Sequence, residues 1–225
     1  MSEVTLALLL VWGTLVGLDL VSVPQMMIAR PLVAGTFAGL LVGDLETGLR
    51  LGIVLELFQF DVLPFGAARY PEYGPATVVA VATAHWLGRT DAWGIGTGLG
   101  LLIALFAGST LHWLRTANAR AVRGAAAQLE AGDAHVLARI HAGGLARDVT
   151  RAALVTATGL AAGWLLWRAG AARLPSHVFA LTSALGGGAA LAAGVAGLLR
   201  IVRPGAGLRW FAAGLAGGVM ALWIA

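Results

Sequence analysis

The chain has 225 residues, of which 59% are hydrophobic and 12% are charged, and its formal net charge is +4. Because a soluble domain carries about 25% charged residues, this composition argues against a water-soluble enzyme, a nucleic-acid-binding protein and a disordered chain. It indicates a multi-pass membrane protein, and the absence of cysteine excludes disulfides and thiolate metal sites.

Charge-free apolar segments mark the expected membrane helices. The first covers residues 4–18 and follows an acidic start, so we expect a retained membrane helix and not a cleaved signal peptide. The later segments cover residues 73–88, 92–114, 152–167, 174–199 and 210–225. A helix needs about 20 residues to cross a bilayer, so only 92–114 and 174–199 are long enough alone. The shorter segments require polar ends, tilt or protein neighbours.

Residues 31–69 are apolar overall but contain charged side chains and prolines that a lipid-facing helix would not tolerate. Such residues occur at membrane depth where they are buried in protein or line a wet cavity. We therefore expect short helices or a re-entrant hairpin at 31–49 and 50–69. The predicted fold is an all-α polytopic membrane protein with about six to eight membrane segments, including this broken or re-entrant helical hairpin.

Three glycines in the same region, Gly35, Gly39 and Gly43, lie four residues apart. This spacing predicts close packing of one helix face against a neighbour. In a chain with 32 glycines the spacing is also common by chance, so alone it is a weak signal.

Residues 115–151 form the one polar insert, with six arginines and three acidic residues. The positive-inside rule places this insert in the cytoplasm, with residues 168–175 outside and 200–209 inside. The Ala-rich stretch 117–129 favours a helix, and Gly132-Asp133 indicates a turn. We expect a single membrane domain over residues 1–225, with residues 115–147 as a polar cytoplasmic insert.

Polar side chains near the first apolar segments are the candidates for substrate binding. Sugar sites combine carboxylates and amides, which hydrogen-bond hydroxyl groups, with aromatic faces that cover C–H surfaces. Buried acids at membrane depth must find partners, which makes them functional candidates. The candidates from this reasoning are Asp19, Gln25, Glu56 and Gln59, with Asp61 less favoured.

A structural interpretation of these polar residues stays open. They could lie at the aqueous interface or form ion pairs with Arg30, Arg50 and Arg69. For Asp44 and Glu46 we favour a structural role, because Gly43-Asp44 is typical of a turn.

Motifs for catalysis or metal binding are missing from the sequence. There is no Gly-x-Ser-x-Gly motif and, without lysine, no P-loop. The five histidines lie singly along the chain. We therefore expect no catalytic residue, no metal site and no cofactor.

Several short motifs follow one another along most of residues 10–200. They are Arg30-Pro31-Leu32-Val33, Gly39, Gly43-Asp44-x-x-Thr47-Gly48, Gly52-x-x-Leu55-Glu56 and Gly66-Ala67-Ala68-x-x-Pro71-Glu72, and later residues 125–128, 132–133, 140–141, 174–175 and 186–188. In this order and spacing they resemble the enzyme II C component of the mannose/fructose/sorbose family of bacterial phosphotransferase systems.

The resemblance implies a membrane subunit that translocates a hexose-type sugar and passes it to a cytosolic B component for phosphorylation. It implies pairing with a D membrane subunit, while cytosolic A and B components carry phosphate derived from phosphoenolpyruvate. The chain itself would then be a transport subunit and not an enzyme. A multi-pass location in the bacterial inner membrane and a homo- or hetero-oligomer are also implied.

By position, Glu56 falls on the family's membrane-embedded acid, and Gly66 and Ala67 fall on its hairpin. The resemblance therefore assigns these three residues to substrate binding. Residues 60–64 are more acidic and aromatic than the family pattern. The sequence also ends at residue 225, where family members usually continue for roughly another helix, so we expect different terminal packing or a different contact with the D subunit.

Two other functions fit the same sequence. The chain could be a carrier of similar fold for another small polar solute without phosphorylation, or a non-transporting membrane scaffold subunit. Genes for A, B and D components beside this one would favour the phosphotransferase hypothesis, and their absence would favour the alternatives.

Overall fold

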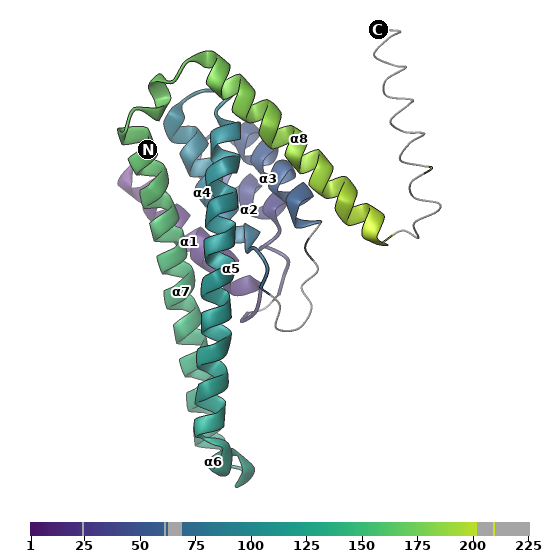
Figure 1. Ribbon diagram of the computed structural model, residues 1–225. Coiled ribbons are helices and arrows are strands. Elements are labelled where there is room, and N and C mark those ends of the chain that lie inside the picture. The colour runs from purple at the N-terminus through teal and green to yellow at the C-terminus, as the bar shows by residue number, and fades with distance from the viewer. Residues whose placement is uncertain (24, 61, 63–68, 202–208, 210–225) are drawn as a thin grey trace.

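The computed structural model describes residues 1–23, 25–60, 62, 69–201 and 209. These residues form helices and connecting segments, which confirms the predicted all-α class (Figure 1). The helices in chain order are α1 (Glu3–Asp19), α2 (Pro31–Val42), α3 (Leu45–Gln59), α4 (Tyr73–Leu87), α5 (Trp93–Gly124), α6 (Ala126–Glu130), α7 (Ala134–Arg168), the 3-10 helix η1 (Ala171–Arg173) and α8 (Ser176–Ile201). The apolar segment expected at 210–225 lies outside the described residues.

Within the described residues, three helices are long and apolar enough to cross a membrane: α5, α7 and, over Ser176–Leu199, α8. Helix α1 has 17 residues, α3 and α4 have 15 each, and α2 has 12. All four are shorter than the about 20 residues that a span requires. Long apolar helices at 92–114 and 174–199 are thus confirmed, and the total of six to eight membrane segments stays a prediction.

Helices α2 and α3 form a hairpin. Helix α2 ends at Gly43, whose φ of +73° is a conformation that glycine adopts without strain. The Asp44 carboxylate then accepts the backbone N–H of Thr47 at 3.1 Å and caps the start of α3. Short helices are therefore confirmed in this region and Asp44 serves the turn. The expected division at residues 49–50 is wrong, because both residues lie within α3 and the chain turns at Gly43-Asp44 instead.

Glycines on both helices allow the hairpin to pack closely. A Cβ atom added at Gly48 would lie 2.5 Å from the carbonyl oxygen of Gly35, and one added at Gly39 would lie 2.8 Å from that of Asp44. Such distances mean that the backbones approach as only glycine allows. The predicted packing face is confirmed for Gly35 and Gly39 but is wrong for Gly43, which makes the turn.

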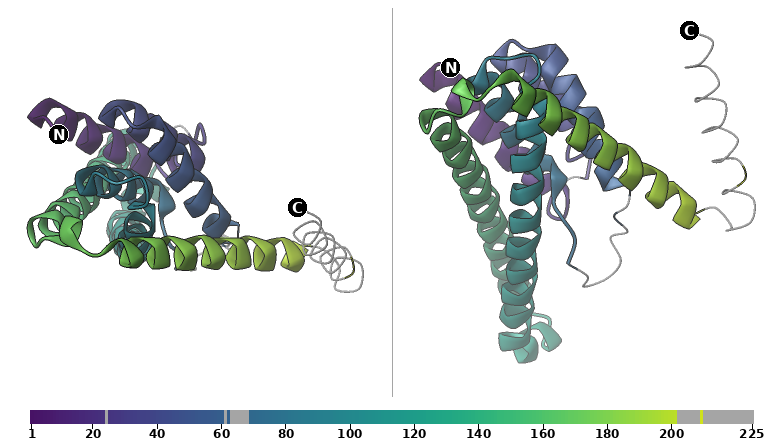
Figure 2. Two further views of the ribbon diagram at one scale, coloured as in Figure 1. Left: turned by 90° about the horizontal axis from the view of Figure 1, so that it is seen from above. Right: turned by 45° about the horizontal axis from the view of Figure 1, so that its top comes forward.

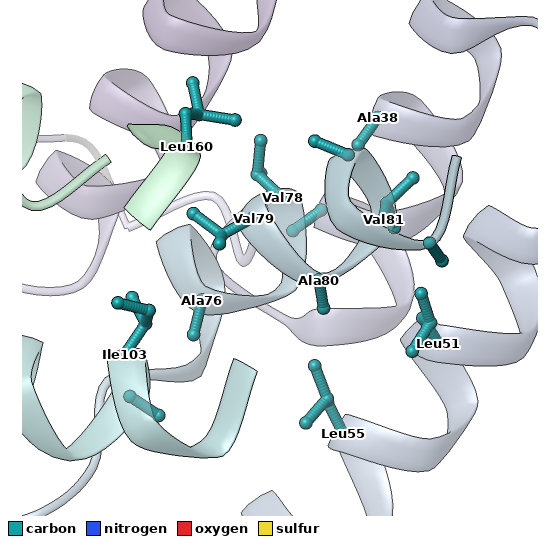
Figure 3. Packing of buried hydrophobic residues seen from close by; sticks show 14 of the residues in the cluster. Ala38, Leu51, Leu55, Ala76, Val78, Val79, Ala80, Val81, Ile103 and Leu160 are labelled. Carbon is teal, nitrogen blue, oxygen red and sulfur yellow. The ribbon is translucent and has the colours of Figure 1, made fainter. Parts of the chain in front are cut away.

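Helix α4 occupies the centre of the bundle. It packs against α1, α2, α3, α5 and α7, and 13 of its 15 residues are buried. Its valines and alanines face apolar side chains from several of these helices (Figure 3). The hydroxyl of Thr77 donates to its own helix at the Tyr73 carbonyl, 2.7 Å away. This helix is apolar all round because it is enclosed all round.

Helices α5 and α7 lie side by side and extend together beyond the rest of the bundle, with α6 at the far end (Figures 1 and 2). The Arg147 guanidinium donates to the Asn118 side chain at 2.8 Å and joins the two helices. Gly132 has a φ of +78°, and the Asp133 carboxylate caps α7, so the predicted turn is confirmed. The polar insert at 115–147, hereafter the polar hairpin, is thus mostly a continuation of two long helices.

Helix α8 packs against α5 and α3. The Ser183 hydroxyl donates to the Asp91 carbonyl at 2.8 Å and accepts the N–H of Gly94 at 3.3 Å, which fixes α8 to the start of α5. In both views of Figure 2, α8, drawn in green to yellow, extends toward one side of the bundle. Its exposed leucines suit an apolar surrounding.

Candidate functional site

The open end of the α2–α3 hairpin brings Glu56 and Arg30 together. Because the two helices run in opposite directions, the end of α3 lies beside the start of α2. The Glu56 carboxylate forms an ion pair with Arg30 and accepts the backbone N–H of Leu32 at 3.1 Å. A carboxylate at a helix start is favoured by the free N–H groups there. The Glu56 side chain is only 13% exposed.

A cavity of about 130 Å³ lies beside this ion pair. It is enclosed by the end of α1, the segment before α2, the end of α3 and the segment that leads into α4. The lining residues are Leu20, Ala29, Arg30, Gln59, Val62, Tyr70, Pro71, Glu72, Tyr73 and Gly74. Two phenol rings, an amide, a guanidinium and a carboxylate therefore meet at one place.

Gln59 is the lining residue with unused hydrogen-bonding capacity. Its amide oxygen is buried and has no hydrogen-bond partner within the described part of the chain. A buried polar atom without a partner is costly, and native proteins satisfy nearly all of them. A ligand hydroxyl or a water in the cavity would satisfy this acceptor.

The part of the cavity wall formed by Glu72 is held by a buried charge cluster. Both carboxylate oxygens of Glu72 accept from Arg151, at 2.6 and 3.1 Å. Arg151 also donates to Asp148 at 2.8 Å and to the carbonyl of Gly17 at 3.2 Å. Asp148 in turn accepts from the Ser22 hydroxyl. The cluster thus joins helices α1 and α7 to the segment before α4.

Tyr70, in the same wall, is held by a second arginine. The Arg115 guanidinium donates to the Tyr70 hydroxyl and lies 5.0 Å from the centre of its ring. Cations over aromatic rings are attracted by the ring quadrupole. The backbone N–H of Glu72 donates to the Ala104 carbonyl at 2.9 Å, so α5 also fixes the main chain here.

The other predicted candidates lie in different places. The Asp19 carboxylate is buried and accepts the backbone N–H groups of Met26 and Ala29, at 2.6 and 3.1 Å, so it orders the turn between α1 and α2. Gln25 is exposed, has a φ of +58°, and does not line the cavity. Gly66, Ala67 and Asp61 lie outside the described residues.

Of the predicted candidates, the structure thus places Gln59 in the cavity wall, Glu56 against the lining residue Arg30, and Gln25 elsewhere. Sequence reasoning missed Tyr70 and Arg151 and named Glu72 only as part of a motif. One signal was available, because Asp148 and Arg151 are spaced three apart on one helical face at the edge of an apolar segment.

Among the described residues, no group of three or more histidine, aspartate or glutamate side chains is placed to hold a metal ion. The cavity offers hydrogen-bond donors, acceptors and aromatic faces. Such groups can bind a small polar molecule.

Comparison with known proteins assigns the family. Residues 4–221 match the family model described as the sorbose-specific IIC component of the PTS system. The chain is 36% identical over 107 residues to the fructose permease IIC component of Bacillus subtilis. It is 33% identical over 79 residues to the sorbose-specific EIIC component of Lacticaseibacillus casei, and 33% identical over 81 residues to the mannose-specific EIIC component of Escherichia coli K12.

These alignments cover 48%, 35% and 35% of this chain. They cover 38%, 28% and 28% of the three relatives, so the matched part spans well under half of their length.

Two solved structures share the fold. One, described as a membrane protein, has a TM-score of 0.70 at 21% identity and covers 100% of this chain and 96% of that one. The other is the mannose transporter ManYZ in complex with microcin E492, with a TM-score of 0.64 at 20% identity, covering 100% of this chain and 95% of that one. Because the family model matches nearly the whole sequence, this chain belongs to the family of sorbose-specific IIC components of the bacterial phosphotransferase system.

Proposed function

We propose that this multi-pass membrane protein is the sugar-translocating subunit of a phosphoenolpyruvate-dependent phosphotransferase system. It binds a hexose-type sugar and passes it to a cytosolic B component. The observation that carries the proposal is the polar cavity with the Gln59 amide oxygen, which has no hydrogen-bond partner among the residues that the structure describes. The relatives named as fructose, sorbose and mannose components support a sugar as the solute.

Polar groups in and beside the cavity have roles in this proposal. Gln59 accepts a sugar hydroxyl, and the rings of Tyr70 and Tyr73 cover C–H surface. Glu56 does not line the cavity, but its ion pair holds Arg30, which does. Phosphoryl transfer belongs to the partner A and B components.

The size of the cavity supports a partner subunit. Small-molecule sites usually have about 300–1,000 Å³, and this cavity has about 130 Å³. A D membrane subunit therefore completes the sugar path in our proposal. The ManYZ structure shares the fold of this chain and supports such a pairing. The polar hairpin faces the cytoplasm, the side on which the A and B components meet the membrane.

The proposal is tested by sugar binding to the chain purified with its D subunit. Thermal-shift titration with a panel of hexoses and hexosamines identifies a ligand, because a ligand that binds the folded state raises its apparent stability. The informative variants are Glu56→Gln and Gln59→Leu. Glu46→Gln is the matched control, because Glu46 lies in the same helix, is 77% exposed and pairs with Arg50 away from the cavity.

We expect one sugar to bind selectively, with binding weakened in Glu56→Gln and Gln59→Leu and unchanged in Glu46→Gln. Wild-type affinity in both Glu56→Gln and Gln59→Leu would overturn the site. Absence of binding for every sugar, in a complex shown to be assembled, would overturn sugar transport and favour another solute or a scaffold role. Uptake that proceeds without phosphoenolpyruvate would favour a carrier without phosphorylation.

A further inference from the structure

Two arginines hold the cavity wall from outside the cavity. Arg151 of α7 binds Glu72, and Arg115 of α5 binds Tyr70. Neither arginine lines the cavity, whereas both of their partners do. Arg115 and Arg151 lie on the two long helices where the polar hairpin joins the bundle. Two residues at the base of that hairpin, one on each long helix, therefore hold the wall residues Tyr70 and Glu72 in place.

The Arg151 cluster is deeply buried. The exposed fractions are 2% for Glu72, 0% for Asp148 and 8% for Arg151. Buried ion pairs are a weak source of stability, because desolvation opposes the attraction, and packed apolar residues often stabilise as well. Two donors on one carboxylate instead fix the orientation of that carboxylate. The directions in which the Glu72 oxygens can accept a further hydrogen bond are fixed by the same contacts.

We infer that Arg151 and Arg115 are positioning residues of the substrate site. They fix Glu72 and Tyr70 in the geometry that recognises the sugar, and they do so without touching it. The inference rests on the proposed function and extends it to residues of α5 and α7. It also predicts that selectivity between sugar epimers depends on both arginines, because the orientation of one acceptor distinguishes the two positions of a hydroxyl.

The test measures sugar affinity per folded complex for Arg151→Lys and Arg115→Lys. Lysine keeps the charge but cannot make the forked contact of a guanidinium. The control is Arg147→Lys, because Arg147 lies one turn from Arg151, binds Asn118 and does not line the cavity. We expect the Kd of the preferred sugar to rise about tenfold in each of the two variants and to stay unchanged in the control, because small displacements of positioning groups have large effects.

A mutant cycle separates positioning from a general effect on the fold. If Arg115 acts through the Tyr70 hydroxyl, then Arg115→Lys combined with Tyr70→Phe should bind the sugar no more weakly than Tyr70→Phe alone. The discrimination between epimers should fall in Arg151→Lys and Arg115→Lys. A merely structural role would lower the thermal midpoint and leave both the affinity of the folded fraction and the epimer ratio unchanged.

The outcomes separate the two proposals. Wild-type affinity and epimer ratio in both lysine variants, with a wild-type complex that binds sugar, would overturn the positioning role and leave the transport function standing. Additive losses in the Arg115–Tyr70 cycle would also overturn it. A wild-type complex that binds no sugar would overturn both. If Arg151→Lys does not assemble, the Arg115 and Tyr70 variants decide, because they leave the buried carboxylates paired.

Discussion

Replacing Gly48 by alanine tests the close packing of the α2–α3 hairpin. The added methyl group would lie 2.5 Å from the carbonyl oxygen of Gly35 and 2.7 Å from the Cα atom of Gly39. Both neighbours are backbone atoms of α2, so no side chain can move aside. The helices must separate, and the Glu56–Arg30 pair that joins them at the open end must follow.

Two opposing effects set the size of the change. Alanine favours a helix over glycine by about 1 kcal/mol. Forcing a methyl group into a filled space costs about 1–3 kcal/mol, and the two backbone overlaps at Gly48 place it at the upper end. We expect a net loss of about 2 kcal/mol in unfolding free energy. For a chain of this size that corresponds to a fall of roughly 4–8 °C in the thermal midpoint.

Thermal unfolding of the detergent-purified protein, followed by the fluorescence of its 8 tryptophans, gives the midpoint. Gly98→Ala in α5 is the control, because a Cβ added there meets nothing within 4 Å. Its midpoint should stay constant or rise. An equal response of the two variants, or a higher midpoint for Gly48→Ala, would refute the packing described for the hairpin.

Three further changes test other contacts. Gly108→Ala would drive a methyl group into the Tyr70 carbonyl, so we expect weaker sugar binding together with a midpoint lowered by several degrees; unchanged binding in titrations would contradict this. Asp19→Ala leaves two backbone N–H groups without their acceptor, and denaturant unfolding should show a loss of about 1–3 kcal/mol. The Arg89 hydrogen bond lowers the pKa of Asp91, so this pair stabilises the fold above the ordinary carboxyl pKa and the contribution is lost as pH falls through the lowered value. Asp91→Asn should flatten that part of a midpoint-against-pH curve, and an identical curve would show that the pair is irrelevant.

Features that depend on neighbouring residues could be predicted from the sequence. The turn at Gly132-Asp133 and the structural role of Asp44 follow from turn and capping chemistry within a few residues. The long apolar helices follow from composition. Glu56 and Gln59 could be proposed because acids and amides are rare in apolar segments and need a partner.

Features that depend on distant residues could not be predicted. Glu72 and Arg151 are separated by 79 positions, and only the packing of α4 against α7 brings them together. The continuation of α5 and α7 through the polar insert was also missed as a structural feature, because a change from apolar to polar composition marks a change of surroundings and not the end of a helix. Gly43 shares the spacing of the packing glycines but is used for its backbone conformation.

Helix α7 runs without a break from the tip of the polar hairpin into the bundle, so a movement at one end of this helix reaches the other end. Asp133 precedes Arg151 by 18 positions, which at roughly 1.5 Å per residue places the far end of the hairpin about 27 Å from the cavity wall. With the Arg147–Asn118 contact joining α7 to α5, the two helices resist bending better than either alone. A rotation of about 5° at the level of Arg151 would move α6 by about 2 Å. A partner that binds α6 and moves it by about 2 Å would therefore rotate α7 by about 5° at Arg151, beside the cavity wall.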